Sequence, residues 1–326
     1  MLSCYLCIVR IDYTYKIVMT KKYRIAHLSD LHLSPEYFPE RTIMFKHILE
    51  QCVELNVDHI IISGDITHQA KSSEFVCARN VLQEFDLLHS HKLTVTIGNH
   101  DIYGGPFHAE DVLLFPAKCK EVKYEEKVKE FYETFHESFE GCKFISAHSI
   151  FPFVKEVGGV ALLGLNSIAQ WNTLRNPLGS NGEIDGEQYS HLNNIFKSNI
   201  IHDIPIFTVV HHHFNALETK KDACGLAKLW QFIELNTMKL HRRKQLLELF
   251  NLNGVSRVLH GHVHTHEEYC YKDVQCLNAG GTMIPEHSGE KKFHLLTVAD
   301  GEVTHRDIIF STVHSQSHQS FLRKIY

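Results

Sequence analysis

Short apolar runs rich in β-branched residues alternate with helical segments through most of the chain. The candidate strands lie at residues 23–29, 59–63, 93–98, 143–147, 160–166, 204–210 and 256–261. Between them, apolar residues recur at the three- and four-residue spacing of a helix face, at Phe45, Ile48, Leu49 and Cys52 and again at Phe75, Ala78 and Leu82. Such alternation predicts an α/β fold.

The remaining segments complete one domain. Residues 240–252 predict a further helix, and the last part of the chain predicts antiparallel strands joined by a turn at Asp300 and Gly301. The Asn-, Gly- and Pro-rich stretch 171–188 predicts a loop over the face where strands end, and the charged stretch 118–140 predicts a solvated helix. We expect a domain at 22–314, a tail at 315–326, and a leader at 1–21 that is disordered or reflects a start upstream of Met19.

Composition narrows the class of protein. A chain of 326 residues with 44% hydrophobic residues can bury a full core, and its first apolar piece is too short and too charged for a membrane span or signal peptide. The formal net charge of −5 makes nucleic acid an unlikely partner, because phosphate binding needs a broad basic surface. Nine cysteines without a secretory signal favour a reducing cytoplasm over a disulfide framework.

Residues of the types that bind metals follow five of the predicted strands, where each strand ends. In chain order they are Asp30 with His32, Asp65, Asn99 with His100 and Asp101, the triplet His211, His212 and His213, and His262 with His264. Open α/β sheets bind ligands beyond the carboxyl ends of their strands, so these side chains are expected to meet. Carboxylate, imidazole and amide groups together suit Mn, Fe, Zn or Co, and two ions sharing one carboxylate would use the set fully.

The same segments match a known family in sequence order. DLH, GDITH, GNHD, VVHHH and GHVH resemble the five signature blocks of the calcineurin-like metallophosphoesterase superfamily, and NAGGT at 278–282 resembles the segment after the last block. The resemblance covers about residues 23–310. It implies a four-layer α/β/β/α sandwich, in which two mixed β-sheets are flanked by helices, and two divalent metal ions as cofactors.

The resemblance also implies roles for individual residues. A first ion would be held by Asp30, His32 and His264, a second by Asn99, one histidine of the triplet and His262, with Asp65 bridging both. The implied reaction is attack on a phosphoester by a hydroxide that bridges the ions. His100 is implied as the proton donor to the leaving oxygen, and we count its neighbour Asp101 with it as catalytic.

The three adjacent histidines cannot share one role, because side chains on an extended chain alternate between faces. By analogy with the family block, His211 is the metal ligand. His212 is then expected in a structural hydrogen bond, and His213 near the substrate rim, where His68 is also a candidate contact. Among the remaining histidines, we expect an interior position for His27, His59 and His260 and a position near the crevice for His148 and His266.

Two features bear on the substrate. Protein phosphatases of this superfamily carry GDxxDRG and GNHE, whereas this chain has GNHD and places His68 and Gln69 where they have an aspartate and a phosphate-binding arginine. A protein phosphatase is therefore disfavoured. Residues 165–192 are similar to the class III cyclic nucleotide phosphodiesterase branch. We expect hydrolysis of a phosphodiester bond in a small phosphoester, such as a nucleotide.

Three alternatives stay open. One is a diphosphatase acting on a lipid-linked nucleotide of the lipid A type, which would need an apolar cap from residues 149–155 or 224–240 and would bring the protein to a membrane surface. The second is a phosphomonoesterase. The third is an interaction scaffold on the same fold, although scaffolds of this kind usually lack several ligands, and here every ligand type is present.

Overall fold

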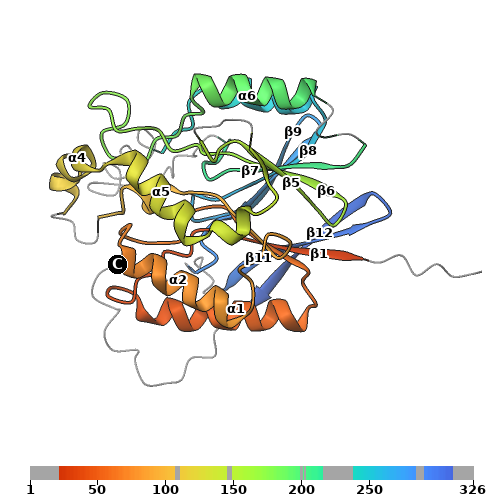
Figure 1. The fold of residues 1–326 in the computed structure, drawn as a ribbon, viewed down its shortest axis with the longest axis horizontal. Coiled ribbons are helices and arrows are strands. Elements are labelled where there is room, and N and C mark those ends of the chain that lie inside the picture. Colours follow the sequence, from red (N-terminus) through yellow and green to blue (C-terminus); the bar gives the residue numbers. More distant parts are fainter. Residues whose placement is uncertain are drawn as a thin grey trace, which may run out of the picture.

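A computed structural model of the chain describes residues 22–106, 111–144, 149–198, 201, 203–215, 238–283 and 290–310. The expected leader at 1–21 and tail at 315–326 lie outside the described residues, as do His148 and residues 224–237. The described part of the chain forms two β-sheets packed face to face, with helices on their outer sides (Figure 1). The predicted four-layer sandwich is therefore confirmed.

The two sheets are both mixed. The five-stranded sheet has the order β12-β11-β1-β2-β3, and the seven-stranded sheet has the order β4-β5-β6-β7-β8-β10-β9. The first comprises β1 (Tyr23–Leu28), β2 (His59–Ile62), β3 (Leu93–Val95), β11 (Lys291–Ala299) and β12 (Glu302–Phe310). The second comprises β4 (Lys143–Phe144), β5 (Phe153–Val157), β6 (Val160–Gly164), β7 (Ile206–Val209), β8 (Val255–His260), β9 (His266–Tyr271) and β10 (Val274–Ala279). Parallel pairing joins β1 to β2 to β3 and β6 to β7 to β8 to β10, so the strand ends of each set meet at one edge.

Helices cover the outer face of each sheet. They are α1 (Pro39–Glu54), α2 (Ser72–Glu84), α3 (Asn99–Ile102), α4 (Asp111–Glu121), α5 (Tyr124–Thr134), the 3₁₀ helix η1 (His136–Phe139), α6 (Gly186–Lys197) and α8 (Arg243–Leu252). In Figure 1, α1 and α2 lie below the sheets and α6 lies above them. Pro39 suits the start of α1 because its fixed φ fits a helix, and Asp185 caps α6 by accepting a hydrogen bond from Gln188 N at 2.7 Å.

The alternation along β1 explains how the layers hold together. Ile25 is fully buried in the apolar cluster between the two sheets, together with Phe207 of β7. Its neighbour Ala26 is fully buried on the other face, in the cluster that includes Phe45 of α1. A strand buried on both faces reads as a continuous apolar run, which is why the sequence pattern located these strands.

One sequence expectation was wrong in detail. Residues 118–140 do not form one solvated helix, because they contain the end of α4, then α5 and η1, and Phe131 and Phe135 pack against Phe75 in the core with ring centroids 6.4 Å apart. Residues 149–155, a candidate apolar cap, contribute Phe151 and Phe153 to the core at 3% and 1% exposure. In the described part of the chain, no helix combines the length and apolarity needed to cross a membrane.

Candidate metal centre

The loops after β1, β2, β3, β7 and β8 meet at one edge of the sandwich. The β1 and β2 loops are joined by backbone hydrogen bonds, from Asp30 N to Gly64 O at 3.1 Å and from His32 N to Asp65 O at 2.9 Å. The β8 loop joins them through His262 N, which donates to both carboxylate oxygens of Asp30 at 3.1 Å. The predicted site residues from distant segments are therefore brought together.

Four of these residues have left-handed backbone conformations. The φ values are 55° at Asp30, 43° at His32, 51° at Asp65 and 74° at His262. Positive φ is uncommon outside glycine, although Asp and His tolerate it better than most residues. Each such residue costs free energy that the surrounding fold must offset, and this strain is found where the side chains converge.

One group of donor atoms contains the three ligands predicted for the first ion. His32 Nε2 lies 3.0 Å from His264 Nε2. Asp30 Oδ1 lies 3.9 Å from His32 Nε2 and 3.7 Å from His264 Nε2. Two imidazole nitrogens and a carboxylate oxygen this close together form a set that could hold one divalent ion.

A second group contains the ligands predicted for the second ion. His211 Nε2 lies 3.0 Å from Asn99 Oδ1 and 3.1 Å from His262 Nδ1, and His262 Nδ1 lies 3.0 Å from Asn99 Oδ1. Asp65 Oδ2 is 3.3 Å from His211 Nε2 and 3.7 Å from His32 Nε2, so one oxygen faces both groups. The bridging role expected of Asp65 fits this position.

The hydrogen positions show that the second group fits a cation. His211 Nδ1 lies 3.0 Å from the carbonyl oxygen of Ser63, which can only accept, so Nδ1 carries the hydrogen. In the neutral ring, Nε2 then presents a lone pair to Asn99 Oδ1 and to the carboxylate of Asp65. Acceptor atoms that converge in this way need a positive charge between them, which a divalent ion supplies.

The electrostatics of the buried residues agree with this arrangement. Burial and then neighbouring imidazoles lower the pKa of His32 and His262 well below the ordinary value, so both rings are neutral, as metal ligands must be. Burial also opposes charge on His211, but the carboxylates of Asp65 and Asp30 raise its pKa to about 9. A bound cation would take the place of that proton.

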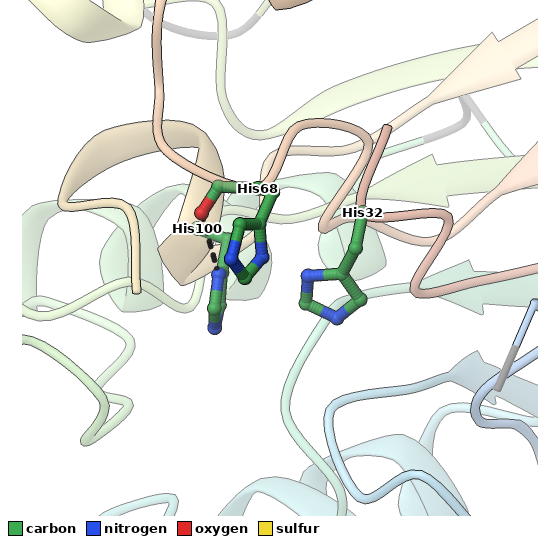
Figure 2. A group of neighbouring side chains, drawn as sticks. All are labelled: His32, His68 and His100. Carbon is green, nitrogen blue, oxygen red and sulfur yellow. Dashed lines mark hydrogen bonds between the residues drawn. The ribbon is translucent and has the colours of Figure 1, made fainter. Parts of the chain in front are cut away.

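Figure 2 shows His100 beside His68 and near His32, which is one of the ligands of the first group. His100 Nδ1 donates to the carbonyl oxygen of His68 at 2.9 Å, and this bond orients the ring. The His100 ring lies edge-on to His32 with centroids 4.4 Å apart and is stacked on His68 at 5.5 Å. His100 N also donates to Asp65 Oδ1 at 2.7 Å, which ties the predicted proton donor to the predicted bridging ligand.

The comparison with protein families decides the assignment. The model of the calcineurin-like phosphoesterase family matches residues 23–266, which include the whole candidate centre. This chain belongs to that family. Calcineurin-like phosphoesterases bind two divalent metal ions, and the two donor groups of this family member supply candidate ligands for both. The protein is thus placed among the metal-dependent phosphoesterases.

Solved structures share the calcineurin-like phosphoesterase fold with this chain. A dimetal phosphatase from Danio rerio has 10% identity and a TM-score of 0.59, covering 89% of this chain and 98% of its own. A purple acid phosphatase from yellow lupin (Lupinus luteus) seeds has 14% identity and a TM-score of 0.52, covering 88% of this chain and 52% of its own. At these identities the likeness shows the fold alone. A comparison with curated protein sequences finds no match.

The hydrogen bonds of the Asp101 carboxylate go to Thr67 and Gly98 and not to a residue of either donor group. Its Oδ1 accepts from Thr67 N at 2.8 Å and from Thr67 Oγ1 at 3.0 Å, and its Oδ2 accepts from Gly98 N at 2.9 Å. Burial and the nearby carboxylate of Asp65 raise its pKa to about 7. These contacts connect the loops after β2 and β3, and the catalytic role expected of Asp101 from the sequence stays a prediction.

The histidine triplet divides into three environments. His211 points into the second donor group, as described above. His212 Nε2 donates to Ser180 O at 3.2 Å and its Nδ1 lies 2.8 Å from Ser167 Oγ, so the predicted structural hydrogen bond is confirmed. His213 is only 2% exposed and lies parallel to the His262 ring with centroids 6.1 Å apart, so it is buried instead of lining an open rim.

The other predicted histidine positions can also be compared with the structure. The expected interior histidines are buried, with His27 Nε2 2.9 Å from Ser63 Oγ and His59 Nε2 2.8 Å from Thr94 Oγ1, while His260 Nε2 lies 2.9 Å from the hydroxyl of Tyr269. His68, a candidate substrate contact, is 8% exposed and lies next to His100. His266 instead pairs with Asp307.

One charged residue of the site was missed in the sequence. Arg41, in the first turn of α1, donates from Nη1 to His32 O at 3.1 Å, and its guanidinium lies 3.7 Å from the ring centre of Phe38. Its positive charge contributes to the lowered pKa of His32, after burial and neighbouring imidazoles. A single arginine on a helix forms no motif, so no sequence signal identified it.

Proposed function

We propose that the protein hydrolyses phosphodiester bonds with two divalent metal ions. The observation that carries the proposal is the pair of adjoining donor groups, faced by one oxygen of Asp65 and flanked by His100. Asp30, His32 and His264 would hold one ion, and Asn99, His211 and His262 the other. When bound, the two ions would activate a water molecule and offset the negative charge that develops on the phosphoryl oxygens.

His100 is assigned as the proton donor. The hydrogen bond from its Nδ1 to His68 O leaves Nε2 at the opposite end of the ring, free of that carbonyl (Figure 2). During hydrolysis the water gives up a proton to solvent as its oxygen bonds to phosphorus, the bond to the leaving alkoxide breaks, and the alkoxide takes a proton from Nε2 of the imidazolium form of His100. The ring then regains a proton from solvent. Such general-acid assistance typically raises a rate by about 100-fold to 10,000-fold.

The residue that stands in place of the phosphatase arginine favours a diester over a monoester. A monoester is a dianion at neutral pH, and protein phosphatases of this superfamily meet it with an arginine where this chain has Gln69. The side chain of Gln69 is engaged by Gly105 O and by Lys118 Nζ. Burial, and then the charge of His100, lower the pKa of His68 to about 3, so His68 adds no charge at pH 7. A singly charged diester needs less compensation.

The deciding experiment is a turnover panel with manganese. Bis(p-nitrophenyl) phosphate, p-nitrophenyl phosphate, cyclic AMP and a UDP-linked diphosphate are compared at equal concentration, with His211→Ala as the metal-site control. We expect hydrolysis of at least one diester at a higher kcat/KM than the monoester, and loss of that activity in His211→Ala. Activity on the monoester alone would contradict the diesterase assignment, and no turnover with both ions bound would favour a scaffold.

The lipid-linked substrate, the cellular location and the metal identity are questions separate from the reaction type. The lipid-linked alternative has lost one of its two candidate cap segments, because Phe151 and Phe153 lie in the core. Turnover of the UDP-linked diphosphate would favour the lipid-linked diphosphatase again. A cytoplasmic location remains a prediction from the cysteine content. Ligand sets of this kind accept several borderline divalent ions, so the metal available in the cell decides which ion is bound.

A further inference from the structure

A third cluster of metal-binding side chains lies outside the centre described above. His294 of β11 and Asp307 of β12 are directly opposite each other in the antiparallel pair, and His266 opens β9 in the other sheet. Asp307 Oδ1 lies 3.0 Å from His294 Nδ1 and 2.9 Å from His266 Nε2. The two imidazole rings are stacked with centroids 4.0 Å apart, so both nitrogens approach one carboxylate oxygen from the same side.

The hydrogen position on His294 leaves no proton between Nδ1 and Asp307 when the ring is neutral. His294 Nε2 lies 3.1 Å from the carbonyl oxygen of Asn278, which can only accept, so Nε2 carries a hydrogen. In the neutral ring, Nδ1 therefore presents a lone pair to the Asp307 carboxylate. The contact needs either a second proton on His294 or a different cation between the two atoms.

A second proton on His294 would pair with the Asp307 carboxylate at 3.0 Å, on a ring that is almost fully buried. The His294 side chain is 1% exposed, so its imidazolium form would be separated from water, and it would lie against a second imidazole at 4.0 Å. A divalent ion avoids this cost, because it binds the neutral form of both rings and is neutralised in part by the carboxylate. The bond from Nε2 to a backbone carbonyl is also the usual means by which a protein orients a metal-binding histidine.

The spacing of the donor atoms is close to that of the second donor group of the dinuclear centre. There, His211 Nε2 lies 3.1 Å from His262 Nδ1 and 3.3 Å from Asp65 Oδ2. Donors bound to one zinc ion at about 2.0–2.1 Å in a tetrahedral arrangement are about 3.3 Å apart. The distances of 2.9 and 3.0 Å in the third cluster are close to this value. Asp307 is 45% exposed, which leaves a path for the ion and room for a water ligand.

We propose that His266, His294 and Asp307 form a zinc site separate from the dinuclear centre. The site joins the two sheets, since His294 and Asp307 belong to the five-stranded sheet and His266 to the seven-stranded one. Two imidazoles and one carboxylate with an open position suit Zn²⁺ and other borderline divalent ions. The zinc ion would stabilise the packing of the two sheets at that edge. This role is structural and is not part of the hydrolysis reaction.

Metal counting on the full chain tests the proposal. Purified protein is stripped of metal with a chelator and equilibrated with Zn²⁺. Unbound zinc is removed by gel filtration, and the number of zinc ions per chain is measured by elemental mass spectrometry. We expect three zinc ions per wild-type chain and two in Asp307→Ala. His305→Gln is the matched control, because His305 lies two residues away on β12 and pairs with Glu268, and it should keep three. Two ions in the wild type, or equal content in wild type and Asp307→Ala, would overturn the proposal.

A second set of variants separates this site from the proposed function. In a chain carrying Asp65→Ala and His211→Ala, which removes ligands of the dinuclear centre, one zinc ion should remain tightly bound and should be lost on adding Asp307→Ala. With Co²⁺ in place of zinc, the same chain should show visible absorption of a four-coordinate site that disappears with Asp307→Ala. Circular dichroism verifies folding of each variant. No retained ion in the folded double variant would refute the site, whatever the turnover panel shows.

Discussion

The glycine before Asn99 offers a test of how tightly the metal centre is built. Gly98 has φ −109° and ψ 172°, an extended conformation that any residue adopts, so replacing it with alanine introduces no backbone strain. The only effect is steric. A Cβ atom at Gly98 would lie 2.1 Å from Asp65 N and 2.2 Å from Asp65 Oδ1, whereas real Cβ contacts below 3.0 Å are essentially never seen.

The size of the required movement predicts which property fails. Opening these contacts to 3.0 Å requires shifts of 3.0 − 2.1 = 0.9 Å at Asp65 N and 3.0 − 2.2 = 0.8 Å at Asp65 Oδ1. Overpacking typically costs about 1–3 kcal/mol, which is less than the 5–15 kcal/mol that stabilises a typical domain, so Gly98→Ala should still fold. Metal–ligand distances tolerate only about 0.2 Å, so the displaced carboxylate should weaken metal binding by about 10-fold to 100-fold.

The assay compares metal affinity with thermal stability. Gly98→Ala, equilibrated with limiting Mn²⁺, should show reduced metal content and turnover while its melting temperature falls by only a few degrees. Gly186→Ala is the control, because a Cβ there meets nothing within 4 Å and the position is the first residue of α6. Wild-type metal content and turnover in Gly98→Ala would refute the argument that Asp65 is held in place by this close approach.

The remaining predictions concern single histidines. His211→Ala should lose one of the two ions of the dinuclear centre, whereas His212→Ala should keep both and lose stability, as metal analysis and melting curves would show. His100→Ala should keep both ions and lower kcat by about 100-fold to 10,000-fold; unchanged turnover would exclude His100 as the proton donor. Burial, then the charge of Lys155, lower the pKa of His59 to about 3, against about 6.5 in the unfolded chain. The contribution of neutral His59 to the free energy of unfolding is complete above pH 6.5 and is lost as the pH falls toward 3. In urea unfolding between pH 6 and 5, the free energy of unfolding of His59→Gln should therefore change with pH less steeply than that of the wild type, by about 1.4 kcal/mol per pH unit.

Most of the layer arrangement could be predicted from the sequence because the central strands are buried on both faces. Ile25 and Ala26 contact different apolar clusters, and the resulting apolar run is unmistakable. The same logic failed for α5, where the many charged side chains concealed one buried face that carries Phe131. It also failed for β5, since a short apolar stretch such as 149–155 has no period that separates a buried strand from a surface cap.

The metal ligands could be predicted because each follows a strand end within a recognisable block. Their separation along the chain is large, as for His32 and His264, but the topology brings strand ends to one edge. Asp101 shows the limit of this reasoning. It lies in the same block as Asn99, yet its carboxylate accepts hydrogen bonds from Thr67 and Gly98, and adjacency in sequence does not show which side chains of a block face the donor groups.

The sequence does not show which atom hydrogen-bonds to the second ring nitrogen of each histidine. That hydrogen-bond partner determines the role of the histidine. Where a backbone carbonyl accepts from one nitrogen, the other is left as a lone pair or a proton donor, as in His211 with Ser63 O, His294 with Asn278 O and His100 with His68 O. His212 has both nitrogens engaged, by Ser167 and Ser180, and so cannot bind a metal. These carbonyls lie 16 to 148 residues away along the chain. The division of a histidine-rich chain into metal ligands, a proton donor and structural residues is therefore a property of the fold rather than of any local motif.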